Sequence, residues 1–69
     1  MPKVGETVRT VNMMFFVEAT HPETGHEIEV QFPRWHRLKV LAVNTKEKTV
    51  ALELPKGYVC TLPFADVEE

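Results

Sequence analysis

Three histidines and one cysteine are the side chains in this sequence best suited to bind a metal ion or to act as a nucleophile. His21 and His26 flank a turn with four residues between them, a spacing that matches no structural zinc motif. Cys60 alternates with Tyr58 and Leu62, which predicts a side chain on a core face, where a thiol is unreactive. We therefore expect no metal, no cofactor, no small-molecule substrate and no catalytic residue.

The segment from Pro33 to Lys39 places the only tryptophan among three cationic residues and no acid. Tryptophan stacks on the bases of a nucleic acid while arginines contact its phosphates. The same residue types dominate the binding energy of protein interfaces. Trp35 is thus a candidate for protein contact, and the candidates for nucleic-acid binding are Arg34, Trp35, Arg37 and Lys39. A third interpretation is a connecting loop in which Trp35 closes one end of the fold.

The overall charge favours protein contact over nucleic acid. Eight Lys and Arg stand against ten Asp and Glu, giving a formal net charge of −2. A protein that covers a nucleic acid normally presents a broad basic surface, because neutralising phosphates supplies most of the affinity. The acidic end of the chain, with Asp66, Glu68 and Glu69, points the same way.

Five large apolar residues follow one another from Met13 to Val17. Side chains of a strand alternate between its two faces, so these five cannot all point into one core. One interpretation is that the rest of the fold covers both faces. The other is that the surplus apolar side chains bind a protein partner or a second copy of the chain. On the second interpretation the partner-binding candidates are Met13, Phe15, Val17 and Trp35.

The pairing register of this segment decides which side chains face outward. In an antiparallel arm whose turn spans His21–Gly25, we expect Thr20 opposite His26. The inward pairs are then Phe16 with Val30 and Met14 with Phe32. A shift of one residue would bring Phe15 and Val17 inward instead, so the sequence leaves the register open.

Alternation of apolar and polar residues predicts strands throughout the chain. Ile28, Val30 and Phe32 alternate with polar residues, as do Val50, Leu52 and Leu54. We expect the remaining strands at 4–11, 38–43 and 58–62, a long hairpin arm over 13–32, a polar hairpin turn at 44–48 and one short 3-10 turn at 63–66. No window shows a capped amphipathic helix. The prediction is a single all-β domain over 1–69, a small barrel of five or six strands.

The layout resembles the SH3-like (Src-homology-3-like) small β-barrels. The features that carry the resemblance are the opening Val4–Arg9 strand, the long arm, the tight hairpin and the late turn before a last short strand. The opening strand, His21-Pro22 on the arm and the closing segment 58–69 also resemble the variable subunit of ferredoxin–thioredoxin reductase, which implies an accessory-subunit role. The segment 59–63 resembles plasmid-type dihydrofolate reductase but lacks the Gln, Ile and Tyr of that family's folate pore, so we expect no reductase activity.

The small size of the domain favours association with a partner or with a second copy. A domain of this length buries only about 60% of the surface that its unfolded chain exposes, and domains this small usually need a disulfide, a metal, self-association or very good packing. One cysteine forms no internal disulfide, and no apolar run approaches the length of a membrane span. We expect a cytoplasmic, non-enzymatic binding module that contacts a protein partner or a second copy; the alternative is a small nucleic-acid-binding protein.

Overall fold

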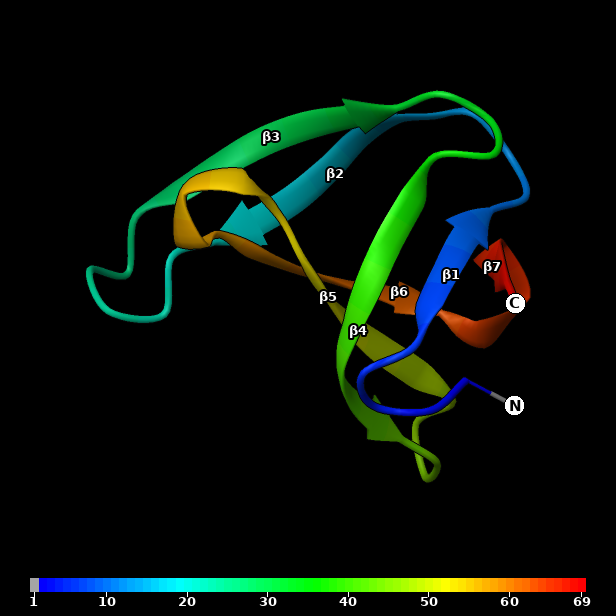
Figure 1. Ribbon diagram of the computed structural model, residues 1–69. Coiled ribbons are helices and arrows are strands. Elements are labelled where there is room, and N and C mark those ends of the chain that lie inside the picture. Colours follow the sequence, from blue (N-terminus) through cyan, green and yellow to red (C-terminus); the bar gives the residue numbers. More distant parts are fainter. Residues whose placement is uncertain (1) are drawn as a thin grey trace.

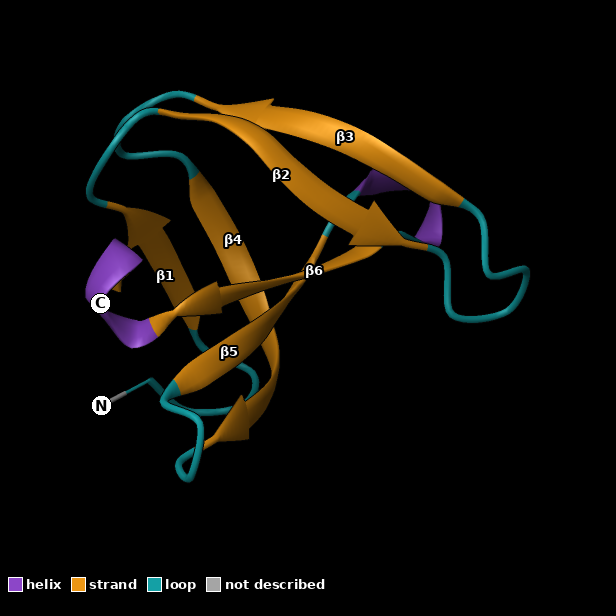
Figure 2. Ribbon diagram, turned by 180° about the vertical axis from the view of Figure 1, so that it is seen from behind, coloured by secondary structure: helices purple, strands orange, loops and turns teal. Residues whose placement is uncertain are grey.

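Seven antiparallel strands and two 3-10 turns make up the computed structural model, which describes residues 2–69 (Figure 1, Figure 2). The strands are β1 (Thr7–Thr10), β2 (Met14–Thr20), β3 (Glu27–Phe32), β4 (Arg37–Asn44), β5 (Thr49–Glu53), β6 (Val59–Pro63) and β7 (Val67–Glu68). Their order in the sheet is β3-β2-β6-β5-β4-β1-β7, and the described strands form one open sheet. The all-β class is confirmed. The expected count of five or six strands is wrong because Val67 and Glu68 pair with β1 as a seventh.

The core follows from alternation along the three central strands. Val40 of β4 lies opposite Leu52 of β5, which lies opposite Cys60 of β6, and all three side chains are buried. Their neighbours along the strands are more exposed, as the alternating pattern of β5 predicts. Figure 1 shows the β2–β3 arm crossing above the meander that β4, β5 and β6 form, and the arm's buried Ala19 and Phe32 belong to the same core.

The β4–β5 hairpin has the turn that the sequence predicts. Residues 45–48 form the turn, and the Asn44 side-chain oxygen accepts a hydrogen bond from the Glu47 amide at 3.0 Å. The pairing register shifts between Val40 and Ala42, which marks a bulge in β4. Because the bulge interrupts the alternation, Leu41 and Ala42 are both exposed and Val43 packs partly on the core.

Two 3-10 turns, not one, are present. The expected one is η2 (Phe64–Asp66), which leads into β7. The second is η1 (Pro55–Gly57), where Lys56 and Gly57 adopt φ of 64° and 85°. These left-handed conformations turn the chain sharply between β5 and β6, and glycine adopts them without strain. The prediction missed η1 although the Pro-Lys-Gly sequence signals a turn. Within residues 2–69 no helix is long and apolar enough to cross a membrane.

The first strand is shorter than the predicted 4–11. It starts only at Thr7, because Gly5 sits in a turn with φ of 88° and donates its amide to the Val40 carbonyl. At its other end the Thr10 side chain is fully buried and lies under the connection between β3 and β4. β1 therefore joins the core to the connection between β3 and β4.

Candidate protein-interaction surface

A β-bulge in the arm determines which apolar side chains reach solvent. Met14 pairs with Phe32, as predicted, but Val17 rather than Phe16 pairs with Val30, and the register shifts between these positions. Toward the tip, Thr20 lies opposite Glu27 instead of His26. Two residues of β2, Phe15 and Phe16, thus lie opposite a single residue of β3. The bulge places Met14 and Val17 three residues apart on the core side.

The bulge turns both phenylalanines away from the core. Phe15 is 55% exposed, Phe16 80% and Met13 58%. Val17, a predicted partner-binding residue, is half-buried and packs against the core. One of the two registers that the sequence left open placed Phe16 on the core side, and it is the most exposed of the three. We call Met13, Phe15 and Phe16 the apolar patch.

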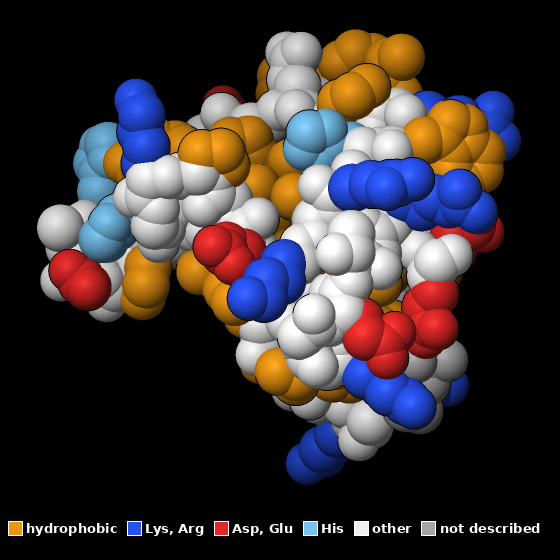
Figure 3. Space-filling view, in the orientation of Figure 1, with side chains coloured by type: hydrophobic (Ala, Val, Ile, Leu, Met, Phe, Trp, Pro, Cys, Tyr) orange, Lys and Arg blue, Asp and Glu red, His pale blue; other side chains and the backbone are white. Residues whose placement is uncertain are grey.

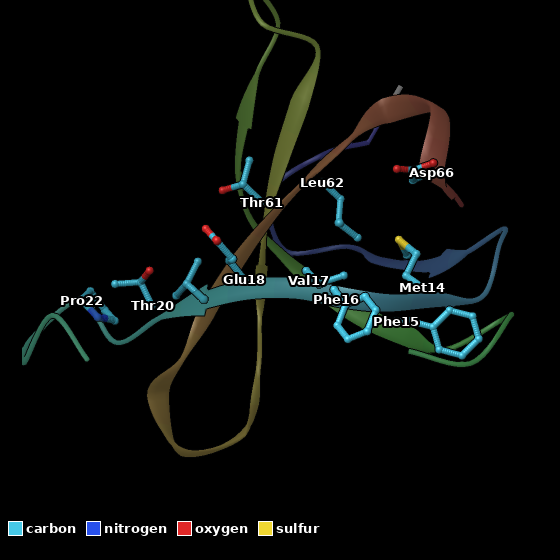
Figure 4. Close-up of a pocket in the computed structure, with 11 residues that line it drawn as sticks. Met14, Phe15, Phe16, Val17, Glu18, Thr20, Pro22, Thr61, Leu62 and Asp66 are labelled. Atoms are coloured by element: carbon cyan, nitrogen blue, oxygen red, sulfur yellow. The ribbon is translucent and has the colours of Figure 1, made fainter. Parts of the chain in front are cut away.

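A groove runs beside the apolar patch, where β2 and β6 separate. The two strands pair only at Ala19 with Cys60 and Thr20 with Val59, so toward Met14 their facing edges are apart. The resulting groove has a volume of about 1020 Å³, and it is seen in Figure 4 with Thr61, Leu62 and Asp66 across from β2. Its apolar lining includes Met14, Phe16, Val17 and Leu62, and its ionisable lining residues, Glu18 and Asp66, are both acids. We call it the β2–β6 groove.

The Trp35 loop (33–36) is held in place by one buried residue. The Thr10 carbonyl accepts a hydrogen bond from the Trp35 amide at 2.8 Å, and the Thr10 amide donates one to the His36 carbonyl at 2.9 Å. The Thr10 hydroxyl donates a hydrogen bond to the Pro33 carbonyl at 2.7 Å and accepts one from the His36 amide at 3.0 Å. These bonds hold Trp35 at φ 68°, a left-handed conformation that is strained for a bulky residue. Its side chain is 48% exposed.

Arginines contact the exposed indole. The guanidinium of Arg9 lies 5.1 Å from the ring centroid and that of Arg34 lies 4.8 Å from it, distances typical of cation–π contacts. Arg9 also forms an exposed ion pair with Glu68 at 3.0 Å. Arg37 and Lys39 are exposed on β4. Figure 3 shows basic and apolar side chains together at the end of the molecule that holds these connections. Both guanidiniums thus lie within cation–π distance of the ring on which a nucleic-acid base would stack.

The histidines of the arm tip contact one tyrosine. His26 Nδ1 and the Tyr58 hydroxyl are hydrogen-bonded at 2.7 Å, and the His21 ring packs edge-on against the Tyr58 ring at 5.3 Å. His36 stacks on Phe32 at the opposite end of the arm. Within residues 2–69, no three His, Cys, Asp or Glu side chains are placed to share a metal ion. The histidines instead join the arm to η1 and to the β3–β4 connection.

Departures from regular backbone occur at the apolar patch and at Trp35, as they do at the exposed Leu41 beside the β4 bulge. The first is the bulge at Phe15 and Phe16, and the second is the left-handed Trp35. Bulges and strained conformations are concentrated at functional sites, because they direct side chains that regular structure would turn elsewhere. No protein-family model matches the chain, and neither a curated protein nor a solved structure matches it. The local geometry of these two sites is therefore the basis on which a function can be proposed.

Cys60 is expected to be inert in the folded protein. Its side chain is 2% exposed, and burial raises the pKa of the thiol from 9.0 to about 11, although a backbone hydrogen bond acts in the opposite direction. At about pH 8, iodoacetamide should modify Cys60 only after unfolding by denaturant, because the thiolate is the reactive form. Because the pKa is raised on folding, the stability that depends on the protonated thiol is complete below about pH 9 and is lost toward pH 11. Rapid labelling under native conditions would contradict this assignment.

Proposed function

We propose that this protein is a non-catalytic binding module, an accessory subunit in character, that acts through protein–protein contacts at the apolar patch. The observation that carries the proposal is the exposure of two adjacent phenylalanines, 55% and 80%. Single exposed apolar side chains are ordinary on protein surfaces, but contiguous ones beside a groove are typical of interfaces. The patch joins the β2–β6 groove through Phe15 and Phe16, which line it.

The neighbouring Trp35 supports the same proposal. Tryptophan and arginine are over-represented among residues that dominate interface energies, and Arg9 and Arg34 already contact the ring. Nucleic-acid binding by Arg34, Trp35, Arg37 and Lys39 is the alternative. We rank it second because the chain as a whole is acidic, with a formal net charge of −2.

We further infer that the open sheet is a member of the SH3-like barrel class. Support comes from the pairing of β1 with both β4 and β7, the β4-β5-β6 meander and the η2 turn immediately before β7. Cys60 is a free, buried thiol, which fits the reducing cytoplasm that we propose for this chain.

Charge substitution tests the apolar patch. We expect Phe15→Glu and Phe16→Glu to leave the fold intact, because both side chains already face solvent and the carboxylate would stay hydrated. Each should weaken partner binding by at least about 10-fold, because a charge would be buried in an apolar contact. The measurement is quantitative mass spectrometry of proteins captured by the immobilised chain from an extract of its source cells.

Val4→Glu is the matched control. Val4 is also a large exposed apolar residue, at 65%, but it lies before β1 and lines neither the groove nor the Trp35 loop. Captured proteins that disappear with Phe16→Glu and remain with Val4→Glu support the proposal. If every captured protein remains with both variants, the apolar patch is only surface and the proposal is wrong.

A further inference from the structure

The β2–β6 groove and the Trp35 loop are complementary in chemistry. The groove offers apolar walls from Met14, Phe16 and Leu62. The loop offers a half-exposed indole flanked by guanidiniums. We propose that the groove of one copy of this chain binds the Trp35 loop of a second copy. The inference rests on the proposed function and names the partner as the chain itself.

Charge supports this pairing of surfaces. Glu18 and Asp66 line the groove, and no Lys, Arg or His does so among the described residues. Glu18 also lies directly opposite Glu29 across the β2–β3 pair, and both are exposed. Like charges in that position repel each other and destabilise the strand pair. An arginine arriving with the second copy, such as Arg34, would relieve that repulsion.

The Trp35 loop is organised in advance as a ligand. Four hydrogen bonds to Thr10 fix the loop, so little conformational entropy is lost when the indole is bound. Its left-handed backbone is strained and persists because Thr10 imposes it. An aromatic side chain on a fixed backbone, with two guanidiniums in contact, is the kind of anchor that fits an apolar groove with acidic residues.

The two surfaces lie close together on the molecule, which suits a closed dimer. Thr10 and Val11 are consecutive and link the two surfaces. Thr10 holds the Trp35 loop, and the Val11 amide donates a hydrogen bond to the carbonyl of Asp66, which lines the groove. In a two-fold dimer each copy would supply its loop to the other's groove, and adjacent surfaces suit this reciprocal arrangement. Self-association would also compensate for the small core of a 69-residue chain that has no disulfide.

Sedimentation velocity from about 1 μM to about 1 mM tests whether the chain dimerises. We expect the purified wild-type protein to shift from monomer to dimer across this range. Phe16→Glu, which alters the groove, and Trp35→Gly, which removes the indole, should each weaken dimerisation at least about 10-fold. Glycine is chosen because it accepts a positive φ, so the loop keeps its backbone. Arg34→Glu is a second loop variant, and Val4→Glu should dimerise like the wild type.

Mixing the variants tests groove-to-loop contact specifically. Phe16→Glu retains an intact loop, and Trp35→Gly retains an intact groove, so an equimolar mixture should form a 1:1 dimer at lower concentration than either variant dimerises alone. In ¹⁵N-labelled Trp35→Gly, amide resonances of Glu18, Thr61 and Asp66 should shift when unlabelled Phe16→Glu is added. A contact of patch against patch would give no recovery on mixing, and that result overturns the assignment.

A wild-type chain that stays monomeric at about 1 mM also overturns the inference. The proposed function has its own readout, which is the Phe16-dependent capture of other proteins. If that capture persists while the chain is monomeric, the apolar patch serves a different protein and only the second-copy inference fails. If neither is observed, both fail.

Discussion

Leu52→Ala is expected to destabilise the protein by about 3 kcal/mol, because it opens a cavity at the centre of the core. Leu52 is fully buried and belongs to β5, with Val40 of β4 and Cys60 of β6 on either side. Strands on both sides limit how far the site can collapse around the cavity. A domain of this size has a total stability of only about 4–10 kcal/mol. Thermal unfolding followed by circular dichroism should show a melting temperature roughly 12–24 °C lower.

Leu41→Ala is the control for Leu52→Ala. Leu41 lies on the neighbouring strand, but its side chain is 38% exposed because of the β4 bulge. Its truncation removes less buried surface and leaves no closed cavity, so a loss of about 1 kcal/mol or less is expected. Equal losses for the two variants would mean that the core is not centred on β5.

Much of the fold could be predicted because β5 and β6 obey a strict alternation. Val50, Leu52 and Leu54 in and beside β5 are all buried as expected, and the 44–48 turn and η2 lie where the sequence places them. Alternation depends only on the two-residue period of a strand and on which face is buried, and both can be read from the local sequence. The all-β class and the meander therefore follow without tertiary information.

The bulges could not be predicted in this way. Alternation assigns faces only while one residue opposes one residue, and the five apolar residues of 13–17 satisfy either register equally. The choice depends on the strand partner and on the core, which accept Met14 and Val17 together. That choice exposes Phe16, which one register placed inward, and half-buries Val17, which the sequence offered as a contact candidate.

Composition marks Trp35 as a candidate contact residue, but it does not predict the conformation of its loop. A tryptophan among arginines signals a contact surface wherever the backbone places it. The left-handed φ of 68° contradicts the local preference of a bulky residue, so only a distant residue can impose it. That residue is Thr10, which is far away in the sequence, and the burial of its hydroxyl cannot be inferred from the residues around it.

Thr10→Val should have the second large effect, because it removes the hydroxyl and keeps nearly the same shape. The hydroxyl donates to the Pro33 carbonyl and accepts the His36 amide. Both groups would lose their partner in a half-buried position, so we expect a loss of about 2–3 kcal/mol in unfolding free energy. Denaturant titration of the variant against wild type measures that loss.

The same substitution should loosen the Trp35 loop, because it removes the two hydroxyl hydrogen bonds and leaves only the two backbone bonds from Thr10. Trp35 is the only tryptophan, so its fluorescence reports the loop directly, and we expect the emission to shift toward that of a fully hydrated indole. Thr10→Ser is the matched control, because serine keeps both hydrogen bonds and loses one methyl group. It should retain the native emission and dimerise nearly as well as wild type, whereas Thr10→Val should dimerise more weakly because the anchor is no longer fixed in advance. Indistinguishable emission and dimerisation for the valine and serine variants would show that the hydroxyl does not hold the loop.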